Sequence, residues 1–257
     1  MKANKIKIGI IGGSGLDDPA ILKDFQEVAM DTPYGKPSSV ITTGQISGRE
    51  VAILARHGKN HSIMPTRVLY RANIWALKEL GCTHILATTA CGSLREEIKP
   101  YDFIFLDQFI DFTKHRNLTF YEDKVVHTTM ADPFCARLRA RLIETARELK
   151  IPHHECGTMV TVEGPRFSTR AESFMFQKLG ADVVNMSTVP EVILAREIGI
   201  CYAAMAMSTD YDCWKTGEEP VTFEMVMERM AHNSANAKKL LLAVIPKIDW
   251  PSCDCKK

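Results

Sequence analysis

Two carboxylates stand two positions apart at Asp210 and Asp212, directly after the apolar run of residues 200–207. Such a run is typical of a buried strand, and side chains at i and i+2 leave a strand on the same side. The ligand site of a buried sheet normally opens at the carboxyl ends of its strands. Paired acids there can accept hydrogen bonds from an amino group, or hold a proton for a leaving nitrogen. The alternative is that one Asp caps a helix and the other is solvated.

Two further strand ends carry groups that suit an anion. The glycine-rich segment 12–15 follows the first apolar strand, and Ser14 adds a hydroxyl donor to its backbone N–H groups. Arg56 and His57 follow the apolar stretch 51–55. The planar fork of an Arg matches phosphate oxygens, and a His adds a tunable donor. The alternatives are a tight turn at the first site and solvated side chains at the second.

A third strand end, at residues 88–93, contains Thr88, Thr89 and Ser93 among small residues. Hydroxyls and small residues at a strand end form an anion-binding nest, although the same residue types also cap helices. The three segments together favour one tetrahedral anion, held by neutral donors and a single Arg.

Two polar loops follow later in the chain. Residues 161–172 contain a Gly-Pro turn and Phe167, which suits an aromatic lid, while the end of this loop is also typical of a helix cap. Residues 185–191 carry Met186 and Ser187 where a strand turns into a helix. Met186 is either core filler, the usual role of Met, or a side chain that faces a ligand.

The sequence argues against several other kinds of site. The glycine-rich segment is not a dinucleotide fingerprint, because Asp18 stands at the third glycine position, and no Walker loop follows. There is no nucleophile elbow and no H-E-x-x-H motif. The eight cysteines show no paired C-x-x-C spacing, so we expect no metal site.

Strand and helix signals alternate, which predicts an α/β fold: a three-layer helix–sheet–helix sandwich around a mixed central β-sheet. A predicted hairpin at residues 40–55 argues against a simple doubly wound sheet. The other expected strands are residues 5–11, 84–88, 103–106, 157–162, 181–185 and 200–207. The expected helices are residues 66–80, 132–150 (with Asp132 as N-cap), 168–179, 189–197 and 222–244.

The length of 257 residues suits a single domain over residues 1–257, with a short C-x-C tail at 250–257. The net charge of +1 gives no basic excess that would indicate nucleic acid or an anionic membrane. The apolar run 240–246 is too short to span a bilayer, and no signal peptide is visible. We therefore expect a cytoplasmic protein with neither a nucleic-acid nor a membrane partner.

Six segments together resemble the purine nucleoside phosphorylase superfamily, and within it the branch that acts on 5′-methylthioadenosine. As a set they are highly specific, and they occur in family order along nearly the whole chain. They are Ile11 to Leu16, Arg56 to Gly58, Thr88 to Leu94, Val162 to Phe167, Asn185 to Ser187 and Thr209 to Trp214.

The resemblance implies a pentosyltransferase that needs no cofactor. Inorganic phosphate, the co-substrate, and 5′-methylthioadenosine would give adenine and 5-methylthioribose 1-phosphate. The implied phosphate site is Ser14, Arg56, His57, Thr89 and Ser187. The implied nucleoside site places Ala90 at the sugar, Met186 at the ribose hydroxyls, Phe167 on the base, and Phe223 with Val226 in the 5′ pocket.

The resemblance also gives the two acids their roles. Cleavage of the glycosidic bond builds negative charge on the purine, and a protonated Asp210 near N7 would act as general acid. Asp212 would accept the 6-amino group. Members that act on 6-oxopurines carry Asn in this region, so the two carboxylates favour adenine.

Three features depart from the animal members of the family. Ser14 and Ser187 stand where those members have Thr, and both keep the hydroxyl. The chain ends where those members have a longer tail that helps to close the 5′ pocket, so adenosine is an expected second substrate. The terminal C-x-C resembles heat-loving prokaryotic members, in which cysteines pair within the subunit. This implies the disulfide Cys135–Cys201. The C-x-C itself could close a small strained disulfide, Cys253–Cys255, or stay reduced.

The family forms trimers, sometimes paired into hexamers, and a neighbouring subunit lends a His at the place of His127. Three alternatives remain. One is a broad-specificity purine nucleoside phosphorylase. A second is a nucleoside hydrolase, against which Arg56 and the nearby hydroxyls argue, because a neutral water needs no such cage. The third is a non-catalytic purine-binding protein, against which the intact Asp210 and Arg56 argue.

Overall fold

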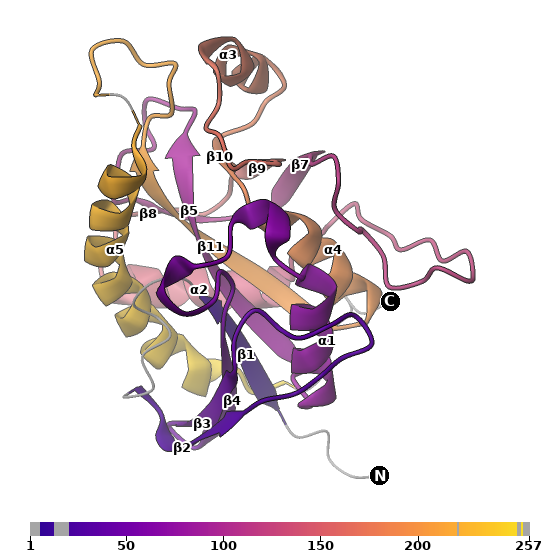
Figure 1. Cartoon of the computed structure of the whole chain (residues 1–257). Helices are drawn as coiled ribbons and strands as arrows, with labels where there is room; N and C mark the ends of the chain where they lie inside the picture. The colour runs from indigo at the N-terminus through magenta and orange to yellow at the C-terminus, as the bar shows by residue number, and fades with distance from the viewer. Residues whose placement is uncertain (1–5, 13–20, 220, 251–252, 254–257) are drawn as a thin grey trace.

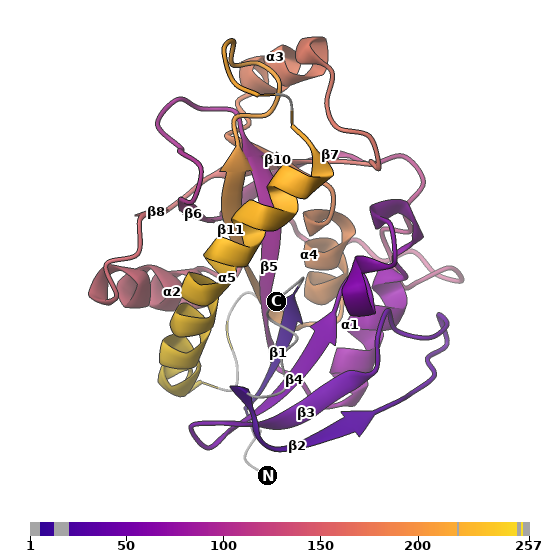
Figure 2. The same cartoon turned by 60° about the vertical axis from the view of Figure 1, so that its left-hand side comes forward.

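A computed structural model describes residues 6–12, 21–219, 221–250 and 253. The predicted anion-site residue Ser14 and the predicted disulfide partner Cys255 lie outside these residues. A mixed β-sheet forms the centre of the fold, with helices on both faces (Figures 1 and 2). The predicted three-layer α/β arrangement is confirmed.

The strands of the described residues form one sheet. They are β1 (Lys7–Gly12), β2 (Lys23–Val28), β3 (Ile41–Ile46), β4 (Arg49–Ala55), β5 (His84–Ser93), β6 (Phe103–Phe105), β7 (Gln108–Phe112), β8 (His153–His154), β9 (Thr158–Val162), β10 (Val183–Asn185) and β11 (Cys201–Asp210). The helices are α1 (Tyr70–Glu79), α2 (Ala136–Glu148), α3 (Arg170–Lys178), α4 (Thr188–Glu197) and α5 (Phe223–Val244), with short 3-10 turns η2 (Lys59–His61), η3 (Pro65–Arg67) and η4 (Ile245–Lys247).

The long strand β5 is the branch point of the sheet. Its first part lies between β1 and β11, and both of these pairs are parallel. Its last residues pair with β10 in the antiparallel sense, and β10 continues the sheet through β9 to β7. On the other side β1 pairs with β4, and β3 completes the predicted hairpin with β4. The carboxyl ends of β4, β1, β5 and β11 therefore lie along one edge.

Alternating apolar side chains fill the space on both faces of the sheet. In β1, Ile8 and Ile10 pack on the face that α2 and α5 cover, whereas Ile11 packs on the face that α1 and α4 cover. Figure 2 shows α2 with α5 and α1 with α4 on opposite sides of the strands. A separate small cluster around Phe176 seats α3 on β9 and β10, at the top of both views. Because helices cover both faces, β1 and β11 are buried along almost their whole length, as central strands are.

Two helices begin four residues later than predicted, at Tyr70 and Ala136 in place of residues 66 and 132. Helix α1 begins at Tyr70, because residues 65–67 form the separate turn η3. Helix α2 begins at Ala136 with Cys135 as N-cap, so the N-cap predicted at Asp132 is wrong. The predicted cap before α3 is confirmed: Thr169 and Glu172 form a capping box.

Three strands were not expected from the sequence. In β2 the residues are largely exposed, so no apolar alternation marks this edge strand, and β8 has only two residues. Strand β7 follows β6 after two residues and pairs with β9, which is a distant part of the chain. Within the described ranges, no helix has the length and apolar character needed to cross a membrane.

Candidate active site

A cavity of about 420 Å³ opens at the carboxyl-end edge of the sheet. Its volume lies within the range of ligand sites, roughly 300–1,000 Å³. It gathers most of the residues that the sequence singled out, from segments far apart in the chain. These are Arg56, His57, Thr89, Ala90, Phe167, Met186, Ser187, Asp210, Asp212, Phe223 and Val226.

His127 is not in this group. Its side chain is exposed, and it does not line the cavity of its own chain within the described residues. The structure therefore leaves the role predicted for it, across a subunit boundary, as a prediction.

Asp210 is the last residue of β11, and its carboxyl group is held on both oxygens. Oδ2 accepts a hydrogen bond from Thr209 Oγ1 at 2.7 Å, and Oδ1 accepts one from the Asp212 backbone N–H at 2.7 Å. Asp210 is 6% exposed, and this burial, opposed by the two hydrogen bonds, raises its pKa to about 6. Gly92 faces it closely, since a Cβ there would lie 2.9 Å from Oδ1.

Asp212 lines the same cavity with an acceptor that the described residues leave unpaired. Its Oδ2 is buried and has no hydrogen-bond partner among them. Burial raises the pKa of Asp212, against hydrogen bonds that Ser173 and Ser168 make to the same carboxyl group. Its backbone has φ of 49°, a left-handed conformation that Asp and Asn tolerate better than most residues. An orphaned buried acceptor costs about 1–3 kcal/mol, so a ligand that donates to Oδ2 would be bound selectively.

Arg56 enters the cavity from the end of β4, where its backbone N–H donates to Gly12 O at 3.0 Å. Its guanidinium group is buried in a two-pronged ion pair with Glu191 at the start of α4: Nε donates to Oε1, and Nη2 donates to Oε2 at 2.9 Å. Nη1 donates to Thr88 O at 2.8 Å. These bonds use three of the five N–H groups, so two can serve a ligand in the cavity.

Glu191 was missed in the sequence. It lies 135 positions from Arg56 and is fully buried. The only available signal was a Glu in the first turn of a helix, which is usually a solvated or capping residue. Tyr202 on β11 also donates to Glu191, at 2.9 Å, and so supports the ion pair.

His57 does not offer the donor expected of it. Its Nδ1 lies 2.9 Å from Ile63 O, and a carbonyl only accepts, so Nδ1 carries the proton and donates there. Burial, with Arg56 beside it, lowers the pKa of His57 to about 3. The ring is therefore neutral near pH 7, and its Nε2 is an acceptor.

Four polar side chains, from β5, β9, β10 and the N-cap of α4, form a chain of hydrogen bonds. Thr161 Oγ1 donates to Asn185 Oδ1 at 2.9 Å, and Asn185 Nδ2 donates to Thr89 Oγ1 at 3.0 Å. Thr89 Oγ1 lies 2.9 Å from Ser187 Oγ. Because Asn185 fills an acceptor position of Thr89, the Thr89 proton is available to Ser187, to a backbone carbonyl or to an anion.

The loop after β9 is fixed to the segment that carries Met186. Gly164 has φ of 71°, and a Cβ there would lie 2.6 Å from Met186 Sδ. Arg116 joins the two segments, since it donates to Glu163 O at 2.9 Å and also to Val189 O. Arg116 was not singled out in the sequence, because nothing in its own neighbourhood indicates a partner so far along the chain.

Aromatic and apolar side chains form the outer part of the cavity. Phe167 and Phe223 are both partly open to solvent. Phe223 is the first residue of α5 and packs against His61, with the ring centroids 5.7 Å apart. This side of the cavity suits an apolar group, whereas Arg56 and the hydroxyls suit an anion and the two Asp suit a base.

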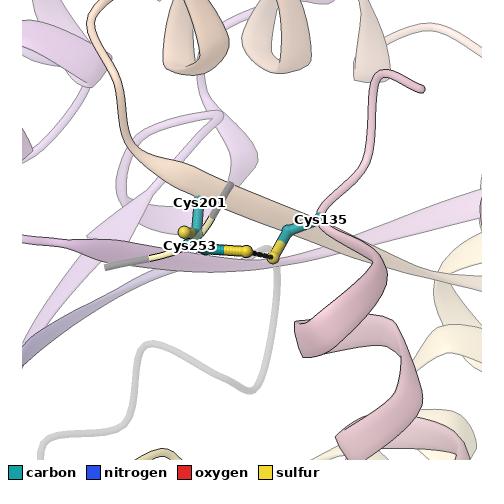
Figure 3. A group of neighbouring side chains, drawn as sticks. All are labelled: Cys135, Cys201 and Cys253. Atoms are coloured by element: carbon teal, nitrogen blue, oxygen red, sulfur yellow. Dashed lines mark hydrogen bonds between the residues drawn. The ribbon is translucent and has the colours of Figure 1, made fainter. Parts of the chain in front are cut away.

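The cysteines predicted to pair lie near each other, together with a third. The sulfur atoms of Cys135, Cys201 and Cys253 are all within 4.8 Å of one another, and Cys135 Sγ lies 3.6 Å from Cys253 Sγ (Figure 3). The disulfide between Cys135 and Cys201 stays a prediction, and the one with Cys255 lies outside the described residues.

The chain is similar to known proteins along most of its length. Residues 7–246 match the model of the phosphorylase superfamily. The S-methyl-5′-thioadenosine phosphorylase of Danio rerio is 56% identical over 256 residues, which cover 96% of this chain and 91% of that protein. The protein of the same name from Thermofilum pendens is 52% identical, covering 98% and 97%.

Solved structures agree with these sequence matches. The methylthioadenosine phosphorylase of Schistosoma mansoni in complex with adenine superposes with a TM-score of 0.92 at 46% identity, covering 96% of this chain and 94% of that one. A mutant of the adenosine/methylthioadenosine phosphorylase from the same organism, in complex with methylthioadenosine, gives a TM-score of 0.91 at 45% identity, covering 96% and 93%.

Proposed function

The chain belongs to the phosphorylase superfamily, and we propose on that basis that it catalyses the phosphorolysis of S-methyl-5′-thioadenosine. Phosphate attacks the anomeric carbon, the glycosidic bond breaks, and the products are adenine and 5-methylthioribose 1-phosphate. The names of the relatives support this substrate. The observation that carries it is one cavity that combines anion donors, an unpaired buried carboxylate oxygen and an apolar outer wall.

The phosphate would bind at the end of the cavity where Arg56, Thr89 and Ser187 meet. The two N–H groups of Arg56 left over from Glu191 and Thr88 can donate to phosphate oxygens, and so can the two hydroxyls. Since Glu191 neutralises most of the charge of Arg56, the site binds its anion chiefly by directed hydrogen bonds. Ser14, outside the described residues, is the remaining proposed donor.

His57 has a different part in this scheme. Its neutral Nε2 accepts, so it would bind a phosphate oxygen that still carries a proton. A bond of this kind favours the singly protonated anion over the fully ionised one. It also orients the anion, because only one of its oxygens can donate.

The base would bind at the opposite end, over the two acids. With a pKa of about 6, Asp210 keeps its proton at a higher pH than an exposed Asp, and can pass it to N7 as negative charge builds on the leaving purine. Asp212 Oδ2 would accept a hydrogen bond from the 6-amino group. A 6-oxopurine places an acceptor against that acceptor, which penalises it.

The nucleoside sugar would lie between these ends. We assign Met186 to the ribose hydroxyls, Ala90 to the sugar face and Phe167 to the base plane. Phe223 and Val226 would line the pocket of the 5′-methylthio group. Adenosine is a proposed second substrate, in line with the name of the Schistosoma mansoni relative.

The reaction as written needs no cofactor, since this chain's own residues bind the anion and supply the proton. The chain would act as one domain, in a trimer or a pair of trimers in which His127 reaches a neighbour's cavity. Its cytoplasmic location stays a prediction from the sequence.

A substrate panel tests the proposal. With phosphate present, we expect 5-methylthioribose 1-phosphate in the phosphorus NMR spectrum and a kcat/KM order of methylthioadenosine, adenosine, then inosine. The Asp212→Asn variant keeps the backbone conformation and replaces an acceptor with a donor, so it should narrow the preference for adenine over hypoxanthine nucleosides by about tenfold or more. An unchanged preference in this variant, or inosine as the favoured substrate of the parent, would contradict the assignment.

A further inference from the structure

Strand β11 carries one extra residue just before Asp210. Ser208 lies opposite Cys91 of β5, and the register then shifts. Asp210 lies opposite Gly92, so Thr209 has no partner of its own in this register. An extra residue of this kind is a β-bulge, which bends the strand and redirects nearby side chains, and bulges are common next to active sites. The direction in which Asp210 leaves the strand therefore depends on how the bulge at Thr209 is held.

Helix α5 holds this bulge by its backbone carbonyl groups. Arg229 Nη1 donates to Thr209 O, and one turn later Asn233 Nδ2 donates to Ser208 O in a longer bond of 3.5 Å. Positions i and i+4 share one face of a helix, so a single face of α5 binds two consecutive carbonyls of β11. The Thr209 hydroxyl in turn donates to Asp210 Oδ2 at 2.7 Å. One residue, Thr209, therefore joins the guanidinium group of Arg229 to the carboxyl group of Asp210.

Arg229 acts from outside the cavity. Among the described residues it does not line the cavity, whereas Val226, Met227 and Met230 of the same helix do. We propose that Arg229 is a positioning residue for Asp210: by holding Thr209 O, it fixes the bulge that aims the carboxyl group into the cavity. This inference rests on the proposed function, in which that carboxyl group protonates the leaving purine.

The charge of Arg229 also acts on Asp210. Burial is the main reason that the pKa of Asp210 is raised to about 6; the charge of Asp212 adds to this effect, and the positive charge of Arg229 opposes it. Cys91 on β5 faces Asp210 as well, but burial raises the pKa of its thiol, which stays neutral near pH 7. Without Arg229, Asp210 would be less well aimed and would also be a weaker acid.

The Arg229→Met variant keeps an apolar side chain and removes the donor and the charge. We expect kcat for methylthioadenosine to fall by about 10- to 100-fold, the effect of a misplacement of roughly 1 Å, with KM for phosphate near the parental value. The decline of kcat/KM at high pH should move to higher pH, because the charge that favours the ionised carboxylate is gone. Arg229→Lys keeps a charge and a donor, so it should recover most of the activity and show the decline near the parental pH.

Arg139→Met is the matched control. Arg139 is also a half-buried Arg on a helix, α2, and donates to a backbone carbonyl, Glu155 O, at 2.7 Å. Among the described residues it does not line the cavity, so this variant should keep the parental kcat and pH profile. Arg229→Gln keeps a donor without the charge and should show the same shift to higher pH, which gives the comparison a second variant if Arg229→Met does not fold.

The pKa of Asp210 can be measured without reference to activity, from the carbon NMR shift of its carboxyl group against pH, and should be higher in Arg229→Met than in the parent. A pKa and pH profile that match the parent, or a loss of kcat equal to that in Arg139→Met, would overturn the inference. A raised pKa together with a parental kcat in Asp210→Asn would instead contradict the proposed general acid, which separates the failure of the proposed function from the failure of this inference.

Discussion

Asp210 keeps its proton to a higher pH than an exposed aspartate because its carboxyl group is buried, and the proposed reaction depends on that proton. The same burial would hinder the charged form, so the group is suited to donate rather than to act as a fixed negative charge. Asp212, two residues on, has its own free acceptor. One strand end therefore supplies a proton donor and a hydrogen-bond acceptor for the same purine.

The Asp210→Asn variant should lower kcat for methylthioadenosine by about 10²- to 10⁴-fold, the usual contribution of a general acid, and change KM for phosphate little. In the parent, kcat/KM should fall as pH rises through about 6, where Asp210 loses its proton. That decline should be absent from the residual activity of the variant. A variant with near-parental kcat would exclude Asp210 as the acid.

Stability gives an independent check on the same residue. Its folded pKa is raised, so Asp210 stabilises the folded state below the unfolded pKa of 3.8, and this contribution is lost as pH rises through about 6. The free energy of unfolding of Asp210→Asn minus that of the parent should therefore be more favourable to the variant at pH 8 than at pH 4, as measured by urea unfolding. A difference that does not depend on pH would contradict the raised pKa.

Residue types at strand ends were enough to predict most of the cavity wall. Asp210, Asp212 and Arg56 each follow an apolar strand, and parallel strands place such residues at one edge. Their partners could not be predicted in the same way. Glu191 and Arg116 form hydrogen bonds with groups far along the chain. The His57 ring has no N–H left for a ligand because its Nδ1–H donates to Ile63 O, which depends on the path of the backbone there.

At the scale of elements, the ion pair between Arg56 and Glu191 joins the end of β4 to the start of α4. Both groups are buried, so the charge of each is balanced mainly by the charge of the other. Glu191→Gln should reduce the free energy of unfolding by about 3–5 kcal/mol, because it leaves an unpaired buried guanidinium group. Added phosphate should recover more of this stability than it adds to the parent, since it supplies the missing charge.

The same substitution in an exposed ion pair, Glu122→Gln, serves as the control for Glu191→Gln. Glu122 pairs with Arg71 but its side chain is 73% exposed, so Glu122→Gln should cost at most about 1 kcal/mol. Equal losses in the two variants would show that the buried pair has no special role.

Gly164 joins the loop after β9 to the residue proposed to bind ribose. Its φ of 71° already disfavours a side chain, and a Cβ would collide with Met186 Sδ. Gly164→Ala should therefore destabilise the protein by roughly 1–3 kcal/mol and displace Met186, raising KM for the nucleoside about tenfold. Gly180 has φ of 86° and nothing within 4 Å of its Cβ position, so Gly180→Ala should show the stability loss alone. If both variants raise KM equally, the contact with Met186 is not the cause.

Elements with strong apolar periodicity were predicted well, and those without it were not. The closing helix, expected at residues 222–244, is α5 with Thr222 as N-cap. Strand β2 has an exposed pattern and exists through its pairing with β3, which the sequence of β2 alone does not encode. The start of α2 at Ala136 similarly reflects packing on β11 and not the Asp-Pro signal that precedes it.

At the scale of the whole molecule, the cavity exists only when β4, β5, β10, β11 and α5 are all in place. The chain after β7 extends from the sheet as a long loop (Figure 1) and presents Val125, which is 83% exposed, and His127. In the proposed oligomer, this loop is the one that would bring His127 to a neighbouring subunit.

His127→Ala should lower kcat/KM for methylthioadenosine by about tenfold while the cavity residues of its own chain stay intact. If His127 acts across a subunit boundary, specific activity should fall on dilution, together with the oligomer mass measured by sedimentation. Full activity in a sample shown to be monomeric would contradict a shared site.

Adenine release from methylthioadenosine, measured with and without inorganic phosphate, decides whether phosphate or water is the nucleophile. We expect release only with phosphate, because Arg56, Thr89 and Ser187 are arranged to hold the attacking anion. Equal release without phosphate would mean that water is the nucleophile, and the anion site assigned to these residues would be wrong.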